Sequence, residues 1–320
     1  MGIRFIVNFV LLALPIGITL GILLALEKHQ SDSGGSPFFQ DNKSSWKQSC
    51  LKSAGIVPPT KGQEYTLNPN QWGWDGQNGS LCMDVLWYNN KTYSKTDKGR
   101  GPEWSVTWQY PQGDPTKPVH AYPNMKVEGN VFPKKVENIK NITLDFEWTY
   151  GVGVNASKKN DWDALEAVTL NANVAMDMFL DNDEENSKDS EKASHEVMVW
   201  FAAIGAATQP LGLTKDKKTI ASAKNMTIDG VKFGLWFDTN QNEQFVITWM
   251  PFEDVDSFTG NLYPLVEEVM KMGTSSNSDY SDFPSSSDYI GYMSWGTEAY
   301  YSEKNVTFNV PKLSINIDTE

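Results

Sequence analysis

Two glutamates far apart along the chain lie in surroundings that suit the hydrolysis of a glycosidic bond. Glu196 begins the run Glu-Val-Met-Val-Trp, which as a strand would place Met198 and Trp200 on the same face as the carboxylate. Glu298 lies between Gly-Thr and Ala-Tyr, again among small and aromatic residues. A retaining glycosidase needs one ionised carboxylate as nucleophile and one protonated carboxyl as acid, about 5–5.5 Å apart. These residue types therefore indicate glycoside chemistry if the fold brings the two glutamates together.

A third carboxylate, Asp177, is predicted to face the same groove. Within residues 173–180, Asp177 shares one face of a strand with Asn173, while the apolar residues of the alternate positions form the core face. A carboxyl beside a nucleophilic carboxylate can hydrogen-bond it and fix its orientation. The same alternation over residues 288–300 assigns one face to Ile290, Tyr292, Ser294, Gly296, Glu298 and Tyr300.

Short strands separated by turn signals occupy most of the remaining chain. Alternating apolar residues mark residues 103–110, 143–150, 231–237, 244–250 and 306–317 as strands. One stretch, residues 261–273, has apolar residues at helical spacing, with Pro264 in the first turn and Gly273 at the end. The pattern predicts an all-β fold, a sandwich or jelly roll of two antiparallel sheets with a concave substrate cleft and one short helix. The acidic run at residues 181–192 is predicted to be a solvated loop.

Residues 1–27 are predicted to be a signal anchor or a signal peptide. The uncharged run from Phe5 to Leu26 is about long enough to cross a bilayer, and Leu23 fits poorly at a cleavage site. A transmembrane anchor is therefore favoured over a cleaved signal, and Arg4 indicates that the remainder lies outside the cell. Residues 28–45 read as a flexible stalk, and residues 46–320 as the folded domain.

Two further features agree with an extracellular or cell-surface location reached through the secretory pathway. The chain has only two cysteines, Cys50 and Cys82, which should form a disulfide in an oxidising compartment. Seven sequons predict glycosylation at Asn42, Asn78, Asn90, Asn141, Asn155, Asn225 and Asn305.

Composition excludes several other classes of protein. The formal net charge of −13 argues against nucleic acid as a partner, because a nucleic-acid interface needs basic residues to neutralise phosphates. Three histidines and no cysteine cluster make a zinc site improbable, so no metal or cofactor is expected. A nucleophile-elbow motif for Ser/His/Asp catalysis is also missing from the sequence. The 12 tryptophans suit either a sugar-binding cleft or a large sandwich core, and composition leaves both open.

Several motifs together resemble glycoside hydrolase family 12, the small endoglucanases and xyloglucanases with a β-jelly-roll fold. The resemblance covers roughly residues 46–312 and rests on the order of the motifs. They are a Glu-x-Met-x-Trp nucleophile strand at residues 196–200, a Gly-Thr-Glu acid/base strand at 296–298, an Asn-x-Trp-Gly cleft motif at 70–73, an Asp-x-Phe at 177–179 and the early cysteine pair. Ala299 stands where family members often have Pro, and residues 151–170 and 181–192 are extra.

The resemblance implies a role for each acid and a class of substrate. Glu196 would be the nucleophile, Glu298 the acid/base and Asp177 the supporting carboxyl, with sugar contacts from Asn70, Trp72, Met198, Trp148, Trp200 and Asn173. The expected protein is a monomeric, retaining endo-glycosidase of β-1,4-glucosidic bonds in xyloglucan, cellulose-like or mixed-linkage glucan. The competing hypothesis is a non-catalytic carbohydrate-binding or recognition protein on the same scaffold.

Overall fold

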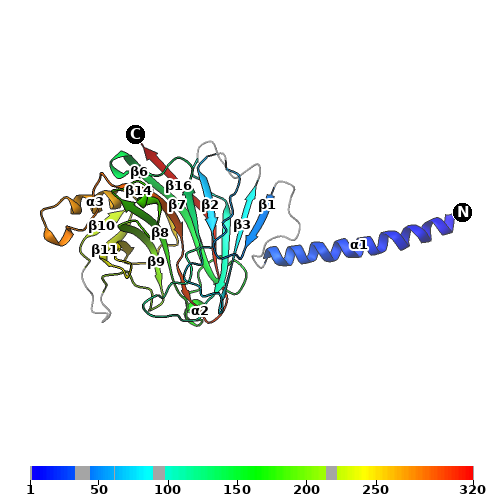
Figure 1. The fold of residues 1–320 in the computed structure, drawn as a ribbon. Coiled ribbons are helices and arrows are strands. Elements are labelled where there is room, and N and C mark those ends of the chain that lie inside the picture. The colour runs from blue at the N-terminus through cyan, green and yellow to red at the C-terminus, as the bar shows by residue number, and fades with distance from the viewer. Residues whose placement is uncertain (1, 33–43, 61, 89–97, 214–221, 320) are drawn as a thin grey trace.

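The computed structural model describes residues 2–32, 44–60, 62–88, 98–213 and 222–319. They form a sandwich of two β-sheets (Figure 1). The smaller sheet has six strands in the order β1 (Ser44–Ser49), β3 (Ser80–Tyr88), β4 (Glu103–Gln109), β16 (Val306–Thr319), β7 (Ile139–Val152) and β13 (Ser257–Asn261).

The larger sheet carries the predicted site. Its ten strands include the path β10 (Asn225–Ile228), β11 (Val231–Thr239), β12 (Phe245–Pro251), β9 (His195–Ile204), β8 (Asn171–Asp181), β14 (Tyr289–Gly296), β5 (Asn124–Glu128) and β2 (Glu64–Asn68). Off this path, β15 (Ala299–Tyr301) pairs with β8 and β6 (Lys134–Lys135) pairs with β14. The two-sheet, all-β prediction is confirmed, with one correction: β12 lies parallel to β9, because the chain passes through β10 and β11 before returning beside it.

Helices are few within the described residues. The predicted helix is present as α3 (Tyr263–Gly273), beginning where Asn261 Oδ1 accepts a hydrogen bond from the Tyr263 amide. A second short helix, α2 (Trp162–Glu166), was not predicted, and three 3₁₀ turns complete the set: η1 (Val136–Asn138), η2 (Asn186–Lys188) and η3 (Ser278–Tyr280). Helix α1 (Gly2–Asp32) precedes the sandwich and runs beyond the apolar residues through Glu27 and Lys28. In the part of the chain that the structure describes, no helix combines the length and the apolar character that a membrane span needs.

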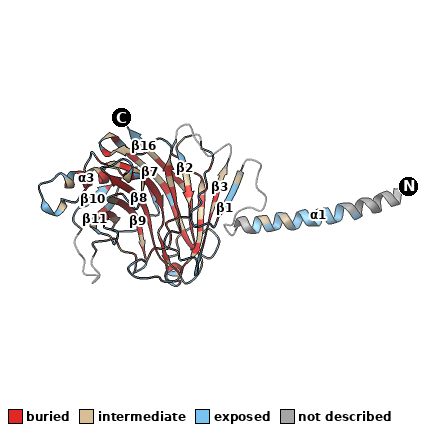
Figure 2. Ribbon diagram, in the orientation of Figure 1, coloured by how far each residue is buried: buried red, intermediate tan, exposed pale blue. Residues whose placement is uncertain are grey.

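The core lies between the sheets, where much of the strand backbone belongs to buried residues (Figure 2). It contains many of the aromatic residues. Trp108, Trp148, Trp249 and Trp295 are almost completely buried there. Alternation holds along β4 and β7, whose inward positions are buried and whose outward positions are partly exposed. Each fully buried aromatic side chain contributes about 1.5–3 kcal/mol relative to exposure. Tryptophan abundance therefore mainly reflects the sandwich core.

The predicted disulfide is confirmed, and it ties β3 to the segment that follows β1. The sulfurs of Cys50 and Cys82 are bonded, across a sequence separation of 32 residues. Among the predicted glycosylation sites, Asn78, Asn155 and Asn225 are exposed, and Asn141 and Asn305 are half-buried. Asn42 and Asn90 lie outside the described residues.

Candidate active site

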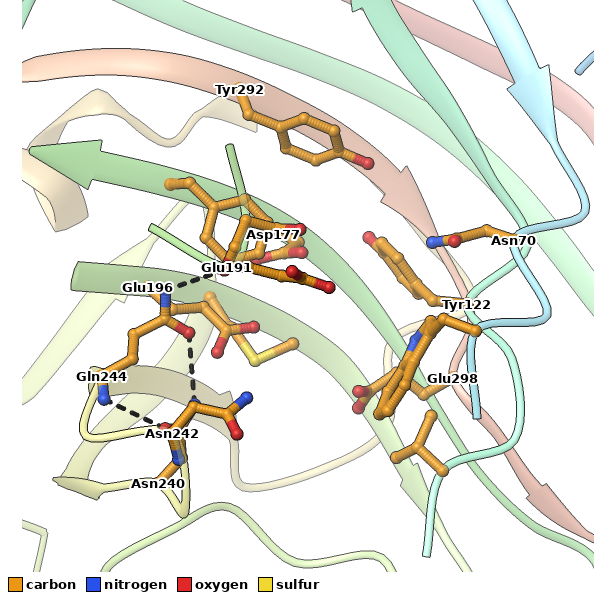
Figure 3. A pocket seen from close by; sticks show the side chains of 15 residues that line it. Asn70, Tyr122, Asp177, Glu191, Glu196, Asn240, Asn242, Gln244, Tyr292 and Glu298 are labelled. Carbon is orange, nitrogen blue, oxygen red and sulfur yellow. Dashed lines mark hydrogen bonds between the residues drawn. The ribbon is translucent and has the colours of Figure 1, made fainter. Parts of the chain in front are cut away.

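A cavity of about 320 Å³ opens on the outer face of the larger sheet, over strands β8, β9 and β14 (Figure 3). Its walls combine the three predicted carboxylates with aromatic side chains of these strands and with aromatic and amide side chains from neighbouring loops. The lining residues are Asn70, Trp72, Val119, Tyr122, Asp177, Phe179, Ser190, Glu191, Glu196, Met198, Asn240, Asn242, Gln244, Tyr292 and Glu298.

Asp177 and Glu196 meet because β8 and β9 are antiparallel neighbours. The register pairs Asp177 with Met198 and Phe179 with Glu196, so both carboxyls project from the same face. The two side chains are close enough to share a hydrogen bond once one of them is protonated, and Asp177 Oδ1 is buried without a hydrogen-bond partner among the described residues. A hydrogen bond between two carboxyls requires a proton, so the pair titrates as a unit.

Burial decides which of the two carboxyls keeps that proton. Loss of solvation raises the pKa of Asp177 well above its ordinary value, and the nearby charges of Glu196 and Glu298 raise it further. Burial also raises the pKa of Glu196 to about 7, while the hydrogen bond from Asp177 lowers it. The favoured state therefore has a protonated Asp177 donating to an ionised Glu196, which is the protonation state that a nucleophile requires.

Glu298 lies between β14 and β15 and is held by Asn173 on β8. The Asn173 Oδ1 atom accepts a hydrogen bond of 2.8 Å from the Glu298 amide, and its Nδ2 donates to Glu298 Oε2. The Tyr300 hydroxyl donates to the same carboxyl oxygen at 3.5 Å. Burial and then the charge of Glu196 raise the pKa of Glu298 to about 8, although the bonds from Asn173 and Tyr300 lower it. A carboxyl with this pKa is protonated at neutral pH and can act as an acid.

A hydrogen-bonded chain from the other sheet supports this end of the cleft. Thr297 Oγ1 donates to the Asn173 carbonyl, and the Tyr150 hydroxyl on β7 lies 2.8 Å from the same Thr297 oxygen. Trp108 Nε1 on β4 donates to the Tyr150 hydroxyl at 3.2 Å. The backbone that carries Glu298 is thus connected to the rigid core.

Residues 63–318 match the model of Glycosyl hydrolase family 12, which covers most of the chain. The chain belongs to this family. It is a glycoside hydrolase.

Similar proteins agree with this membership. The chain is 24% identical over 249 residues to the xyloglucan-specific endo-β-1,4-glucanase A of Emericella nidulans, covering 78% of this chain and 83% of that protein. It is 26% identical to the enzyme of the same name from Aspergillus aculeatus, covering 80% and 86%. Among solved structures, endoglucanase 3 of Trichoderma harzianum matches with a TM-score of 0.61 and 20% identity, covering 88% of this chain and all of that one. The Humicola grisea Cel12A catalytic domain matches with a TM-score of 0.60 and 20% identity, covering 85% and 99%.

The structure of this family 12 hydrolase brings most predicted site residues to one cavity. Asn70, Trp72 and Met198 line it with the three carboxylates, and Trp72 is 56% exposed. Asn173 is buried and contacts Glu298. Trp200 is buried beside Met198, whose sulfur accepts from its Nε1 at 3.4 Å, so it supports the cleft wall from within.

The predicted sugar contact of Trp148 is wrong for this cleft. Trp148 lies on β7 in the opposite sheet, is almost completely buried, and donates from Nε1 to the Val255 carbonyl at 2.9 Å. Its ring packs against Phe308 in the core. Strand alternation over residues 143–150 places Trp148 on the same face as Leu144 and Phe146, and that face is buried in the core.

One wall of the cleft was not predicted. Gln244 donates from Nε2 to the carbonyls of Ser190 and Ala193, at 3.2 and 2.8 Å, and thereby fastens the acidic segment to the β11–β12 turn. This places Glu191 and Asn242 in the lining (Figure 3). The segment has no apolar periodicity, so the sequence offered no sign that it faces the cleft. Tyr122, whose hydroxyl donates to the Ala175 carbonyl at 3.0 Å, was likewise missed as a lining residue.

Proposed function

We propose that this protein is a retaining, endo-acting hydrolase of β-1,4-glucosidic bonds in plant-type polysaccharides: xyloglucan, cellulose-like glucan or mixed-linkage β-glucan. The observation that carries the proposal is that the Asp177–Glu196 pair and Glu298 lie in one cavity. Asp177 lowers the pKa of Glu196, whereas burial and the charge of Glu196 raise the pKa of Glu298, so the two glutamates suit different roles. The names of the similar fungal enzymes favour xyloglucan within this class.

Each acid has a defined part in the proposed reaction. Ionised Glu196 attacks the anomeric carbon and forms a covalent glycosyl-enzyme, while Glu298 gives its proton to the departing glycosidic oxygen. Glu298, now ionised, takes a proton from water, and the resulting hydroxide displaces Glu196 with net retention at the anomeric carbon. Asp177 keeps its proton and donates to Glu196, holding the nucleophilic oxygen in place and sharing the charge that returns to it.

The test measures turnover of xyloglucan and carboxymethylcellulose by the full chain and three variants. Glu196→Gln and Glu298→Gln should each lower kcat/KM by about a thousandfold or more, because each removes a group that reacts. Glu137→Gln is the matched control, because Glu137 is exposed on η1 and does not line the cavity, and it should stay near the parent value.

Product stereochemistry completes the test. NMR of the first-formed product should show the β-anomer, and an α-anomer would exclude the nucleophile role of Glu196. Binding without turnover by the parent protein would favour the carbohydrate-binding alternative.

We infer further that residues 46–320 form one catalytic domain that works outside the cell or at its surface. The Cys50–Cys82 disulfide supports an oxidising compartment, and the exposed sequon asparagines are accessible to glycosylation. Sequencing of the mature N-terminus distinguishes an intact signal anchor at residues 1–27, followed by the stalk, from a cleaved signal peptide. Treatment with an endoglycosidase should increase electrophoretic mobility, and unchanged mobility would contradict glycosylation.

A further inference from the structure

A second, larger cavity lies at the end of strand β9, outside the cleft described above. Its volume is about 560 Å³, which is within the range of small-molecule binding sites. Its floor is apolar and comes from Leu165 on α2 and from Ala203 and Ile204 on β9. Trp162 and Tyr301 line it with the carboxylates of Glu166 and Asp254.

Trp162 is held in a fixed position while much of its ring stays in contact with solvent. Its side chain is 43% exposed, yet its ring contacts Trp148 edge to face, with centroids 6.3 Å apart and planes at 79°. The helix that carries it is anchored by the buried Leu165 and begins where Asp161 accepts a hydrogen bond from the Ala164 amide. An aromatic ring that is already held in place at a cavity can bind a flat apolar surface with little further loss of side-chain freedom.

The polar groups of this cavity are hydrogen-bond acceptors. Asp254 Oδ1 accepts from the Ala203 amide at 3.0 Å, and the described residues provide no hydrogen bond to its second oxygen. Glu166 adds another exposed carboxylate. An anionic ligand would be repelled here, and an apolar ligand would bury carboxylates without partners. A neutral ligand rich in hydroxyls can donate hydrogen bonds to the carboxylates and can place an apolar face against the indole.

The cavity is close to the catalytic cleft. Tyr301 is three residues beyond Glu298, roughly 10 Å of extended strand. The neighbouring Tyr300 donates to the Glu298 carboxyl, and Ala203 pairs with Asn173 in the sheet. The second cavity therefore lies beside the strands that carry and hold Glu298.

We propose that the cavity around Trp162 is a second β-glucan-binding site, in which the indole stacks on a pyranose ring and Asp254 and Glu166 accept hydrogen bonds from sugar hydroxyls. The class of ligand rests on the proposed function. The site binds polymer and takes no part in bond cleavage.

The test compares tryptophan variants of the full chain in the Glu196→Gln background. Affinity electrophoresis in gels that contain xyloglucan measures the Kd for polymer, and calorimetry with cellotetraose measures binding in the cleft. Trp162→Ala should weaken polymer binding about tenfold and leave the Kd for cellotetraose unchanged. Trp46→Ala is the matched control, because Trp46 lies on β1 and is 42% exposed, and it should change neither constant. Trp162→Phe keeps an aromatic contact with Trp148 and should show an intermediate loss.

Two outcomes would overturn the proposal. Polymer binding by both Trp162 variants equal to that of Trp46→Ala would show that the cavity does not bind glucan. Equal losses for polymer and cellotetraose would show that Trp162 acts through the structure of the cleft. Turnover of the unmodified protein is measured in parallel, so that failure of the proposed function is recognised separately from failure of the second site.

Discussion

Replacing Asn173 by Ala should shift the pH dependence of the enzyme, because Asn173 hydrogen-bonds the carboxyl proposed as acid/base. The amide donates to Glu298 Oε2, and this bond favours the ionised form of Glu298. Its loss should raise the pKa of Glu298 above the present value of about 8. In the first step Glu298 must be protonated, so the alkaline limb of the kcat/KM profile should move to higher pH.

The size of the shift follows from the strength of one charge-assisted hydrogen bond. Such a bond contributes about 1.5–3 kcal/mol, and one pKa unit corresponds to about 1.4 kcal/mol, so the limb should move by about one to two units. Tyr300 still donates to the same oxygen, which favours the lower end of this range. Asn173 also accepts from the Glu298 amide, so loss of positioning should reduce kcat/KM at the optimum by about 10- to 100-fold.

Asn171→Ala is the matched control for this experiment. Asn171 is a buried asparagine on the same strand, and its side chain bonds the Thr169 carbonyl and the Ala207 amide without contacting Glu298. Both variants should lose some stability in thermal melts, but only Asn173→Ala should move the alkaline limb. An unmoved limb, a shift to lower pH, or the same shift in Asn171→Ala would refute the positioning role of Asn173.

Three other predictions concern stability. The folded state holds Glu298 with a pKa of about 8 against 4.5 in the unfolded chain, so stability present below pH 4.5 is lost as the pH rises through 8. The melting temperature of Glu298→Gln should therefore exceed that of the parent near pH 8 and equal it near pH 4.5. Equal melting temperatures of the two proteins at both pH values would contradict the raised pKa of Glu298. Trp148→Ala should lower the free energy of unfolding, measured with denaturant, by about 3–5 kcal/mol and leave the KM of the folded enzyme unchanged. A raised KM with an unchanged free energy of unfolding would instead indicate that Trp148 contacts the sugar. Replacing Cys50 and Cys82 together by Ser should lower the unfolding free energy by about 3–4 kcal/mol for this 32-residue separation, which equal denaturation midpoints would disprove.

Strand alternation predicted side-chain faces well where the strands are regular, and it failed at bulges. On β8, alternation correctly assigned Asp177 to the cleft face and its neighbours Met176 and Met178 to the core. On β14 a bulge between Ile290 and Tyr292 reverses the alternation, so Ile290 lies in the core while Tyr292 lines the cleft, although both were predicted to share a face. A bulge inserts one residue into the pairing of two strands, and the local sequence of this strand does not predict it.

The sequence by itself determined the all-β class, the faces of the regular strands and, through motif order, the family. Those properties depend on local backbone geometry and on residue types that can be read along the chain. Only the tertiary structure decided that Asp177 shares a proton with Glu196, that Asn173 holds Glu298 rather than lining the cleft, and that Gln244 fastens the acidic segment over the site. These contacts join residues between about 20 and 125 positions apart or depend on strand register, which is set by long-range pairing and packing. The chemistry of the two glutamates is thus carried in the sequence, and the pKa values that let them act are produced by burial in the folded sheet.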